Sequence, residues 1–309
     1  MIPKISIVLP VHNGMRFLPQ AIRSVQEQTC RDWELIIVDD ASSDRTPEII
    51  IDACRMDERI RSVRHEQNRR LPAALNTGFA LARGEYLTWT SDDNLYRPEA
   101  LCEMAAVLDM QAKVDIVYAG RTYIDDNGCA IQFQPAEPPE LMADHNPVGA
   151  CFLFRRCVHE SLGGYDEKLF LVEDYDFWLR ASCWFRYLAL NKDLYFYRHH
   201  EASLTGTRRD EIIATTDHLL ECRIPGLGWL GSKTQVAALL TVSERYRRRA
   251  DLDAARRVGG KALKCAPFAF VRNEQAVPIT ALLLGYRAAQ LLAWWQSLIK
   301  TNSEGKGAR

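Results

Sequence analysis

Residues 5–11 have the sequence ISIVLPV, a continuous apolar run that is rich in β-branched side chains. Such a run is typical of a strand buried on both faces of a parallel sheet, and a helical pattern over residues 17–28 follows it. The same unit recurs at residues 33–39, WELIIVD, with a helix expected over residues 46–56. This alternation predicts a parallel α/β sheet with right-handed crossovers.

The alternation continues along the next part of the chain. Residues 60–65 are expected to form a weaker strand, residues 71–83 a helix that ends at Gly84, and residues 86–90, YLTWT, a fourth strand. Ligands in such sheets bind beyond the carboxyl ends of the strands. Three polar segments reach that edge, at residues 10–14, 39–40 and 91–94.

Asp92 and Asp93, in the segment SDDN, place two adjacent carboxylates at this edge. Hard anionic oxygens in that position suit Mg²⁺ or Mn²⁺ bridging a diphosphate. The alternative is that the pair caps the helix expected after Pro98.

Asp39 ends the second strand, and Ser43 or Asp44 is expected to cap the next helix. Asp39 is then left to face a ligand, and its carboxylate can accept the imino proton of a uracil or thymine ring. The alternative is that Asp39 also belongs to the cap. Arg69 and Arg70 precede the third helix and are candidate phosphate contacts, with an exposed surface pair as the alternative.

The next part of the chain is less regular. The patterns predict strands at 114–119, 149–155 and 188–198, a hairpin over 121–133 that turns at 126–128, and a helix at 173–183. Within that helix, Glu173, Asp176 and Arg180 fall near one face, which is consistent with a solvated first turn. Residues 197–203, YRHHEAS, end the last of these strands, where two adjacent histidines are by themselves exposed polar residues.

In this order, four segments resemble the nucleotide-binding half of the family 2 inverting glycosyltransferases of the GT-A fold. They are ISIVLPVHNG (5–14), ELIIVDDASSD (34–44), NRRLPAALNTGFALARGEY (68–86) and SDDN (91–94). The resemblance covers about residues 4–205. It implies a nucleotide-diphospho-sugar donor, with Pro10 and Val11 lining the base site, Asp39 on the base, Asp92 near the ribose and Asp93 on a divalent metal.

The sequence departs from the family pattern at one point. Many members have Asp-x-Asp-Asp where this chain has Thr90-Ser91-Asp92-Asp93, so the leading acid is missing. The choice between Asp92 and Asp93 as the main metal ligand therefore stays open. Two carboxylates still suffice for an ion that takes its other ligands from phosphate and water.

The resemblance extends to two later motifs. It implies that Asp174 is the catalytic base and that Glu173 supports it by orienting the acceptor. It also implies that His200, rather than His199, completes the metal site, and a nitrogen ligand would favour Mn²⁺ over Mg²⁺. Arg198 and Arg70 are candidate phosphate contacts.

Composition bounds the remaining possibilities. Hydrophobic residues make up 47% and charged residues 26% of 309, as in an ordinary globular protein. The net charge of −1 provides no field that would attract nucleic acid. Nine scattered cysteines form no CxxC pair, which favours a reducing, cytoplasmic setting over a disulfide framework or a zinc site. The run at 5–11 predicts a strand rather than a signal peptide.

The sequence predicts two domains: an α/β GT-A domain with a Rossmann-like, mostly parallel sheet at residues 1–205, and a C-terminal helical region at 206–309. Residues 244–267 resemble one tetratricopeptide-like helical pair, and residues 277–299 a core or interfacial helix rather than a membrane span. From Glu244 onward there are 13 Lys or Arg and five Asp or Glu, a net charge of +8. These basic helices suggest peripheral contact with the inner face of a membrane.

The expected activity is metal-dependent, inverting transfer of a sugar from a UDP- or dTDP-linked donor to a saccharide or lipid-linked acceptor, in surface polysaccharide or glycolipid synthesis. A sugar nucleotidyltransferase is an alternative, although residues 12–17, HNGMRF, supply little of the Gly-rich basic phosphate loop that such enzymes need. A non-catalytic scaffold on the same fold is a second alternative.

Overall fold

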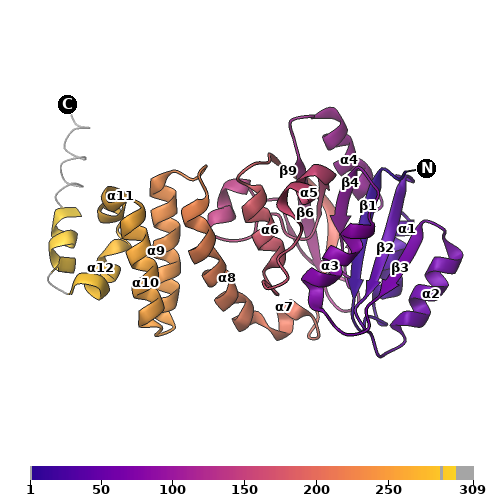
Figure 1. Cartoon of the computed structure of the whole chain (residues 1–309), viewed down its shortest axis with the longest axis horizontal. Helices are drawn as coiled ribbons and strands as arrows, with labels where there is room; N and C mark the ends of the chain where they lie inside the picture. The colour runs from indigo at the N-terminus through magenta and orange to yellow at the C-terminus, as the bar shows by residue number, and fades with distance from the viewer. Residues whose placement is uncertain (1, 286–287, 297–309) are drawn as a thin grey trace. The chain divides into compact units, whose positions relative to one another are not determined.

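The computed structural model describes residues 2–285 and 288–296. Packing divides the chain into two compact units, Met1–Ile212 and Ile213–Arg309. The first unit is built on one nine-stranded sheet with helices, and the second unit is helical (Figure 1). The predicted α/β class with C-terminal helices is confirmed.

The first four strands of the sheet are parallel neighbours, in the order β3-β2-β1-β4. They are β1 (Ile5–Val11), β2 (Trp33–Asp39), β3 (Ile60–Arg64) and β4 (Tyr86–Trp89). Successive side chains of a strand point to opposite faces. In β1, Ile5, Ile7 and Leu9 enter one apolar cluster, whereas Val8 contacts Gly78 of a helix outside that cluster. Burial on both faces explains the continuous apolar run.

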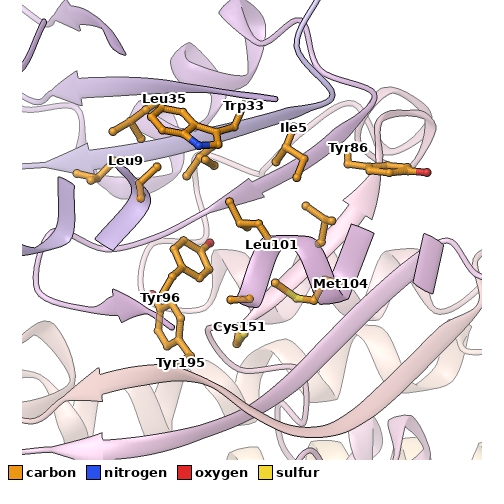
Figure 2. Close-up of a cluster of buried hydrophobic side chains, with 14 of the residues drawn as sticks. Ile5, Leu9, Trp33, Leu35, Tyr86, Tyr96, Leu101, Met104, Cys151 and Tyr195 are labelled. Carbon is orange, nitrogen blue, oxygen red and sulfur yellow. The ribbon is translucent and has the colours of Figure 1, made fainter. Parts of the chain in front are cut away.

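Helices cover both faces of this parallel part of the sheet. They are α1 (Leu18–Gln26), α2 (Thr46–Met56), α3 (Arg70–Leu81) and α4 (Ala100–Met110). α1, α2 and α4 contribute Leu18, Ile50 and Leu101 to the cluster that includes Leu9, part of which Figure 2 shows. α3 packs against β1 and β2, where Gly78 lets the helix approach Val8 closely.

Beyond β4 the sheet contains strands of both directions. These strands are β5 (Leu95–Tyr96), β6 (Ile116–Ile124), β7 (Ala130–Gln134), β8 (Phe152–Arg155) and β9 (Tyr187–Arg198). β8 pairs antiparallel with β4 and β6, β9 runs parallel to β6, and β5 and β7 are antiparallel to β9 and β6. The hairpin predicted at residues 126–128 is confirmed as the β6–β7 turn. Antiparallel neighbours need only such a short turn, whereas parallel neighbours need a crossover.

Shorter helices complete the first unit. They are the 3₁₀-helix η1 (Pro139–Ala143), α5 (Arg156–Leu162), α6 (Glu173–Ala181) and α7 (Leu204–Thr207). Trp178 of α6 is fully buried and packs edge-on against Phe152 of β8, with 4.8 Å between ring centroids. This packing fixes α6 against the sheet, and the first turn of α6 carries Glu173 and Asp174.

The helices of the second unit depart from two sequence expectations. They are α8 (Arg209–Arg223), which crosses the boundary between the units, η2 (Ile224–Gly226), α9 (Ser232–Arg248), α10 (Leu252–Cys265), α11 (Pro267–Arg272) and α12 (Ala276–Leu284). α9 begins well before the predicted helical pair at 244–267, so that stretch holds only the end of α9 and all of α10. The single helix predicted at 277–299 is wrong, because α12 ends at Leu284 and Gly285 has φ +92°.

Residues 297–299 of that expected helix lie outside the described residues. Among the helices at residues 2–285 and 288–296, none combines the length and the apolarity needed to cross a membrane.

Buried acids hold the second unit together. On α8, Asp217 accepts a hydrogen bond at 2.6 Å from Arg249, the residue that follows α9. One turn later, Glu221 accepts from Arg257 at 2.8 Å and from Lys261 at 2.7 Å, both on α10. Burial opposes ionisation of Glu221, but these cations outweigh it and lower its pKa. Part of the basic charge of this unit is therefore used internally.

Glu34 of β2 plays a comparable part at the opposite end of the sheet from the carboxyl ends of the strands. Its side chain, 2% exposed, accepts hydrogen bonds from Ser6 Oγ at 2.7 Å, from Arg61 at 2.7 Å and from the backbone and guanidinium of Arg83. Burial would raise the pKa of Glu34, but these donors outweigh it and lower the pKa.

We expect Glu34→Gln to reduce the free energy of unfolding of the protein by about 2 kcal/mol at pH 7, since charged hydrogen bonds are lost. Because the folded pKa is lowered, the contribution of Glu34 is complete above its unfolded pKa of about 4.3 and is lost as pH falls through the folded value. Urea unfolding at pH 7 and pH 3 would measure the difference in free energy of unfolding between variant and wild type. Glu85→Gln, at an exposed position, is the control. A difference that did not shrink in acid would contradict this account.

Candidate active site

The carboxyl ends of β1, β2 and β4 meet at one edge of the sheet. Val11 is level with Asp39, and the Asp40 amide donates to the Val11 carbonyl at 2.8 Å. From the other side of β1, the Thr90 amide donates to the Val8 carbonyl at 3.0 Å. The structure therefore brings together the three segments that the sequence placed at a ligand-binding edge, with Pro10 and Val11 buried between the two acidic segments.

Asp39 and Asp40 are both buried but have different partners. Asp39 accepts from the Ser42 amide at 2.9 Å and from the Arg64 guanidinium, so it is not free as the sequence suggested. Each carboxylate oxygen has a second lone pair, which leaves room for one more donor. The N-cap of α2 is Arg45 rather than Ser43 or Asp44 as expected; Asp44 accepts from the amide of Thr46, the first residue of α2.

Asp40 organises the loop before α3. It accepts from His65 Nδ1 at 2.7 Å and from the amides of Arg69 and Arg70 at 2.8 Å each. Arg70 has φ +70°, a strained conformation for this residue type that the carboxylate helps to stabilise. The Arg70 side chain is exposed, and its guanidinium lies 5.2 Å from the centre of the Phe170 ring. It therefore has the freedom required of a phosphate contact.

Asp92 and Asp93 follow β4 and do not cap a helix. α4 begins only at Ala100, so the capping alternative is wrong. Asp93 Oδ2 lies 2.9 Å from Nε2 of His200, whose side chain is 9% exposed. Within the described part of the chain, Asp93 Oδ1 and His200 Nδ1 are buried without a hydrogen-bond partner. Buried polar atoms without partners are costly, which indicates a place for a ligand.

The electrostatics of this group are those of an anionic cluster. Burial, followed by the charge of Asp93, raises the pKa of Asp92. The hydrogen bond to Asp93 raises the pKa of His200. A divalent cation would relieve this crowding of negative charge.

Asp93 and His200 fit a metal ion that takes most of its ligands from substrate phosphates and water. Among the described residues, no group of three or more His, Cys, Asp or Glu side chains could hold a metal alone. One or two carboxylates combined with substrate phosphates is the usual arrangement for Mg²⁺, and an imidazole ligand also suits Mn²⁺. The unpartnered Asp93 oxygen is the observation that supports the fit.

Arg198 does not have the phosphate-binding role that the sequence suggested. Its side chain is almost fully buried, and its donors are used within the protein. Nε donates to the Asp93 carbonyl at 3.0 Å, Nη1 to the carbonyls of Asp125 and Asp126, and Nη2 to Gln20 at 2.9 Å. Arg198 therefore ties the Asp93 loop to the β6–β7 turn and to α1.

Gly14 sets the position of Asp92 from the β1 side. A Cβ at Gly14 would overlap Asp92 Oδ2 and Val11 Cγ2. We expect Gly14→Ala to destabilise the protein by about 1–3 kcal/mol and to weaken binding of UDP with Mn²⁺ about tenfold, because Asp92 or Val11 must move.

Thermal unfolding and calorimetric titration with UDP would test this expectation. The control is Gly260→Ala in α10, where a Cβ has open space and the helix gains about 1 kcal/mol. If Gly14→Ala bound UDP with wild-type affinity, Gly14 would not be placing Asp92 for nucleotide binding.

α6 places a second pair of acids in its first turn. Glu173 is 4% exposed and Asp176 fully buried, with Asp176 bonded to Arg180 at 2.7 Å, so the expected solvated first turn is wrong. Asp174 is partly exposed; its Oδ1 accepts from the Tyr175 amide at 2.6 Å and its Oδ2 from Asn146 Nδ2 at 2.9 Å.

Glu173 and Asp174 differ in how well their negative charge is stabilised. Burial raises the pKa of both, and the charge of Asp174 raises that of Glu173 further. Donors from Tyr175 and Asn146 oppose this at Asp174, whereas Glu173 Oε2 is buried with no partner among the described residues. The negative charge is therefore better stabilised on Asp174 than on Glu173.

Tyr165 contacts both β4 and α6. Its hydroxyl accepts from Trp89 Nε1 of β4 at 3.0 Å, and its ring stacks on Phe177 of α6 with 4.6 Å between ring centroids. Burial raises the pKa of Tyr165, and the charges of Asp174 and Glu173 raise it further. Its backbone is held by two hydrogen bonds to Asn76 of α3, both at 2.9 Å.

Sequence reasoning did not find Asn146, Asp40 as the centre of a network, or Gly14 as a spacer. Asn146 lies in a loop with no motif, and only its contact with Asp174 gives it significance. The close approach of Gly14 to Asp92 likewise depends on two segments far apart in the sequence.

Comparisons with known proteins give the family and the fold of the chain. The model of the family described as "Glycosyl transferase family 2" matches residues 6–163, just over half of the chain. The putative glycosyltransferase EpsE of Bacillus subtilis is 32% identical over 184 residues, which covers 58% of this chain and 66% of EpsE. An uncharacterized glycosyltransferase of Rickettsia typhi, RT0329, is 29% identical over 227 residues, 68% of each chain.

Solved structures share the fold at lower identity. Residues 1–349 of S. aureus TarS, in complex with UDP-GlcNAc, superpose with a TM-score of 0.67 at 16% identity, over 97% of this chain and 92% of that one. The mannosyltransferase PcManGT from Pyrobaculum calidifontis, in complex with GDP-Man and Mn²⁺, gives 0.56 at 18% identity, over 96% and 88%. The first unit thus has the GT-A fold, and the chain belongs to glycosyl transferase family 2.

Proposed function

We propose that this chain is a metal-dependent inverting glycosyltransferase that moves a sugar from a nucleotide-diphospho-sugar to an acceptor hydroxyl. The observation that carries the proposal is the Asp93–His200 pair at the end of β4, with a buried carboxylate oxygen and a buried imidazole nitrogen that have no partner among the described residues. Such a pair, at the carboxyl edge of a parallel sheet, suits a metal-bound diphosphate.

The donor nucleotide is assigned to the edge formed by β1, β2 and β4. Pro10 and Val11 form its apolar wall, Asp39 accepts a hydrogen bond from the imino N–H of the base, and Asp92 lies near the ribose. Exposed Arg70 reaches the phosphates. Uridine or thymidine donors are favoured because an acceptor such as Asp39 matches their imino proton; the complexes of TarS with UDP-GlcNAc and of PcManGT with GDP-Man support a nucleotide-sugar donor.

Asp93 and His200 are the proposed metal ligands, with Mn²⁺ or Mg²⁺ as the ion. When bound, the ion neutralises the charge that develops on the departing diphosphate. Asp174 is the proposed base: it takes the proton from the acceptor hydroxyl as the oxygen attacks the anomeric carbon from the face opposite the diphosphate. Glu173 supports the base and orients the acceptor. Direct displacement needs no covalent enzyme intermediate.

The acceptor is proposed to be a saccharide or a lipid-linked saccharide, as in surface polysaccharide or glycolipid synthesis. The nine cysteines, all within described residues, are free thiols, which supports a cytoplasmic setting. Exposed aromatic residues in the basic second unit, Phe268 (83%) and Trp294 (63%), support contact with an anionic membrane surface. Failure of the full chain to sediment with phosphatidylglycerol vesicles at low salt would remove the membrane contact.

A two-step experiment tests the activity. Thermal unfolding with Mn²⁺ and a panel of UDP-, dTDP- and GDP-sugars identifies the donor, because ligands that bind the folded state raise the unfolding temperature. Nucleoside diphosphate release from that donor is then measured with and without EDTA. We expect metal-dependent release of nucleoside diphosphate. Release of pyrophosphate from a nucleoside triphosphate would instead indicate a nucleotidyltransferase, and binding without turnover a scaffold.

A further inference from the structure

The loop before β8 makes a direct contact with the proposed base. Asn146 Nδ2 donates to Asp174 Oδ2 at 2.9 Å. The Oδ1 atom of the same amide accepts from the amides of Val148 at 3.2 Å and Gly149 at 3.4 Å. Because the acceptor end of the side chain is used by its own loop, the donor end must face Asp174.

The loop around Asn146 is also held by contacts that do not involve the Asn146 side chain. Tyr175 of α6 donates from its hydroxyl to the Met142 carbonyl at 2.7 Å, which fastens η1 to α6. Gly149 has φ +65°, and the Arg121 guanidinium occupies the space where a Cβ at Gly149 would lie. Loss of the Asn146 amide should therefore leave the loop in place.

Asp174 has several neighbours that can influence its charge. On α6, Glu173 is adjacent, and the Tyr175 amide donates to Oδ1. In the α5–α6 loop, burial and then the charges of both acids raise the pKa of Tyr165, so it faces them as a neutral phenol. Asn146 therefore supplies a neutral side-chain donor on the Oδ2 side, opposite the atom that is bonded to the Tyr175 amide.

We propose that Asn146 is a positioning residue for the transfer reaction: its Nδ2–H donates to Asp174 Oδ2, favours the ionised form of the base and keeps its carboxylate in one orientation. This inference rests on the proposed function of Asp174. A hydrogen bond to the charged form of a carboxylate favours that form, and a fixed carboxylate presents its remaining lone pairs in one direction.

Two substitutions separate this role from a purely structural one. Asn146→Ala removes both the donor and the acceptor, whereas Asn146→Asp keeps the acceptor for Val148 and Gly149 and replaces the donor to Asp174 with a carboxylate. If Asn146 only shaped its loop, Asp would preserve the rate and Ala would not. If its donor serves the base, Asp is the worse replacement at neutral pH, because two facing carboxyls share a proton.

The measurement is the rate of nucleoside diphosphate release with Mn²⁺ and saturating donor. Water serves as the acceptor, so the natural acceptor need not be known. UDP-GlcNAc is the first probe, replaced by whichever panel donor gives the larger Mn²⁺-dependent thermal shift. We expect Asn146→Ala to reduce kcat at pH 7 about tenfold to 100-fold and to move the acidic limb of the pH profile upward. The kcat of Asn146→Asp should be lower than that of Asn146→Ala at pH 7 and should increase as pH rises. The donor KM should be unchanged in both variants.

Asn191→Asp, on an exposed part of β9, makes the same chemical change away from the site and should retain the wild-type rate. A double-mutant cycle completes the test: in an Asp174→Asn background, Asn146→Asp should change the residual rate less than twofold. If Asn146→Asp kept the wild-type activity and pH profile while Asp174→Asn was inactive, the role of Asn146 would be overturned and the base assignment would stand. Full activity of Asp174→Asn would instead overturn the proposed base.

Discussion

Asp174→Asn is expected to reduce the rate of sugar transfer by about 10²–10⁴-fold, the usual contribution of a general base. The amide has the size of the carboxylate, and its oxygen can still accept from the Tyr175 amide or from Asn146, so the first turn of α6 should keep its structure. Without an ionised oxygen, nothing at this position removes the acceptor proton. The affinity for the donor with Mn²⁺ should stay within about twofold of wild type, since Asp174 is assigned to the acceptor side.

The pH profile gives an independent check on this assignment. Burial raises the pKa of Asp174 above its usual range, so wild-type kcat should rise with pH as Asp174 loses its proton, and this limb should be absent from the residual activity of Asp174→Asn. Asp253→Asn, at an exposed position in α10, is the matched control for an Asp-to-Asn change. Normal turnover by Asp174→Asn would eliminate the base assignment.

Asp93→Asn is expected to reduce metal-dependent turnover about 10³-fold, because a site with few protein ligands loses its principal charged one. The amide preserves the size of the side chain, and the Asp93 carbonyl remains available to Arg198, so the loop after β4 should stay folded. The extra thermal stabilisation that Mn²⁺ gives in the presence of UDP should also disappear. If that increment persisted in Asp93→Asn, the ion would be held by other residues.

The two neighbouring histidines provide a matched pair for the same test. His200 is bonded to Asp93, whereas His199 is exposed and stacks on Tyr123 with 4.7 Å between ring centroids. The same measurement, the extra thermal stabilisation by Mn²⁺ in the presence of UDP, applies to both histidines. We expect His200→Gln to lose this stabilisation and His199→Gln, the control, to keep it. If both variants lost the Mn²⁺-dependent stabilisation equally, the two histidines would contribute to folding rather than to binding of the ion.

Several parts of the fold were predictable because their signals are local. The strands at Ile5–Val11 and Trp33–Asp39 and the helix at Thr46–Met56 have the predicted boundaries. Two-sided burial produces continuous apolar runs, and turn residues mark where each run ends. The antiparallel pairs of β8 were not predictable from its apolar pattern, because parallel and antiparallel strands buried on both faces have similar sequences.

The sequence by itself determined the order of strands and helices in the first half of the chain and the carboxyl edge at which the acids gather, and it showed that the segments with Asp92, Asp93 and Asp174 resemble family motifs. Only the tertiary structure decided which polar groups are already engaged. It bonds Arg198 to the Asp93 carbonyl, 105 positions away, and aims Asn146 at Asp174, 28 positions away. The physical reason is that periodicity and capping act over a few residues, whereas a buried donor or acceptor takes its partner from whichever segment folding places beside it.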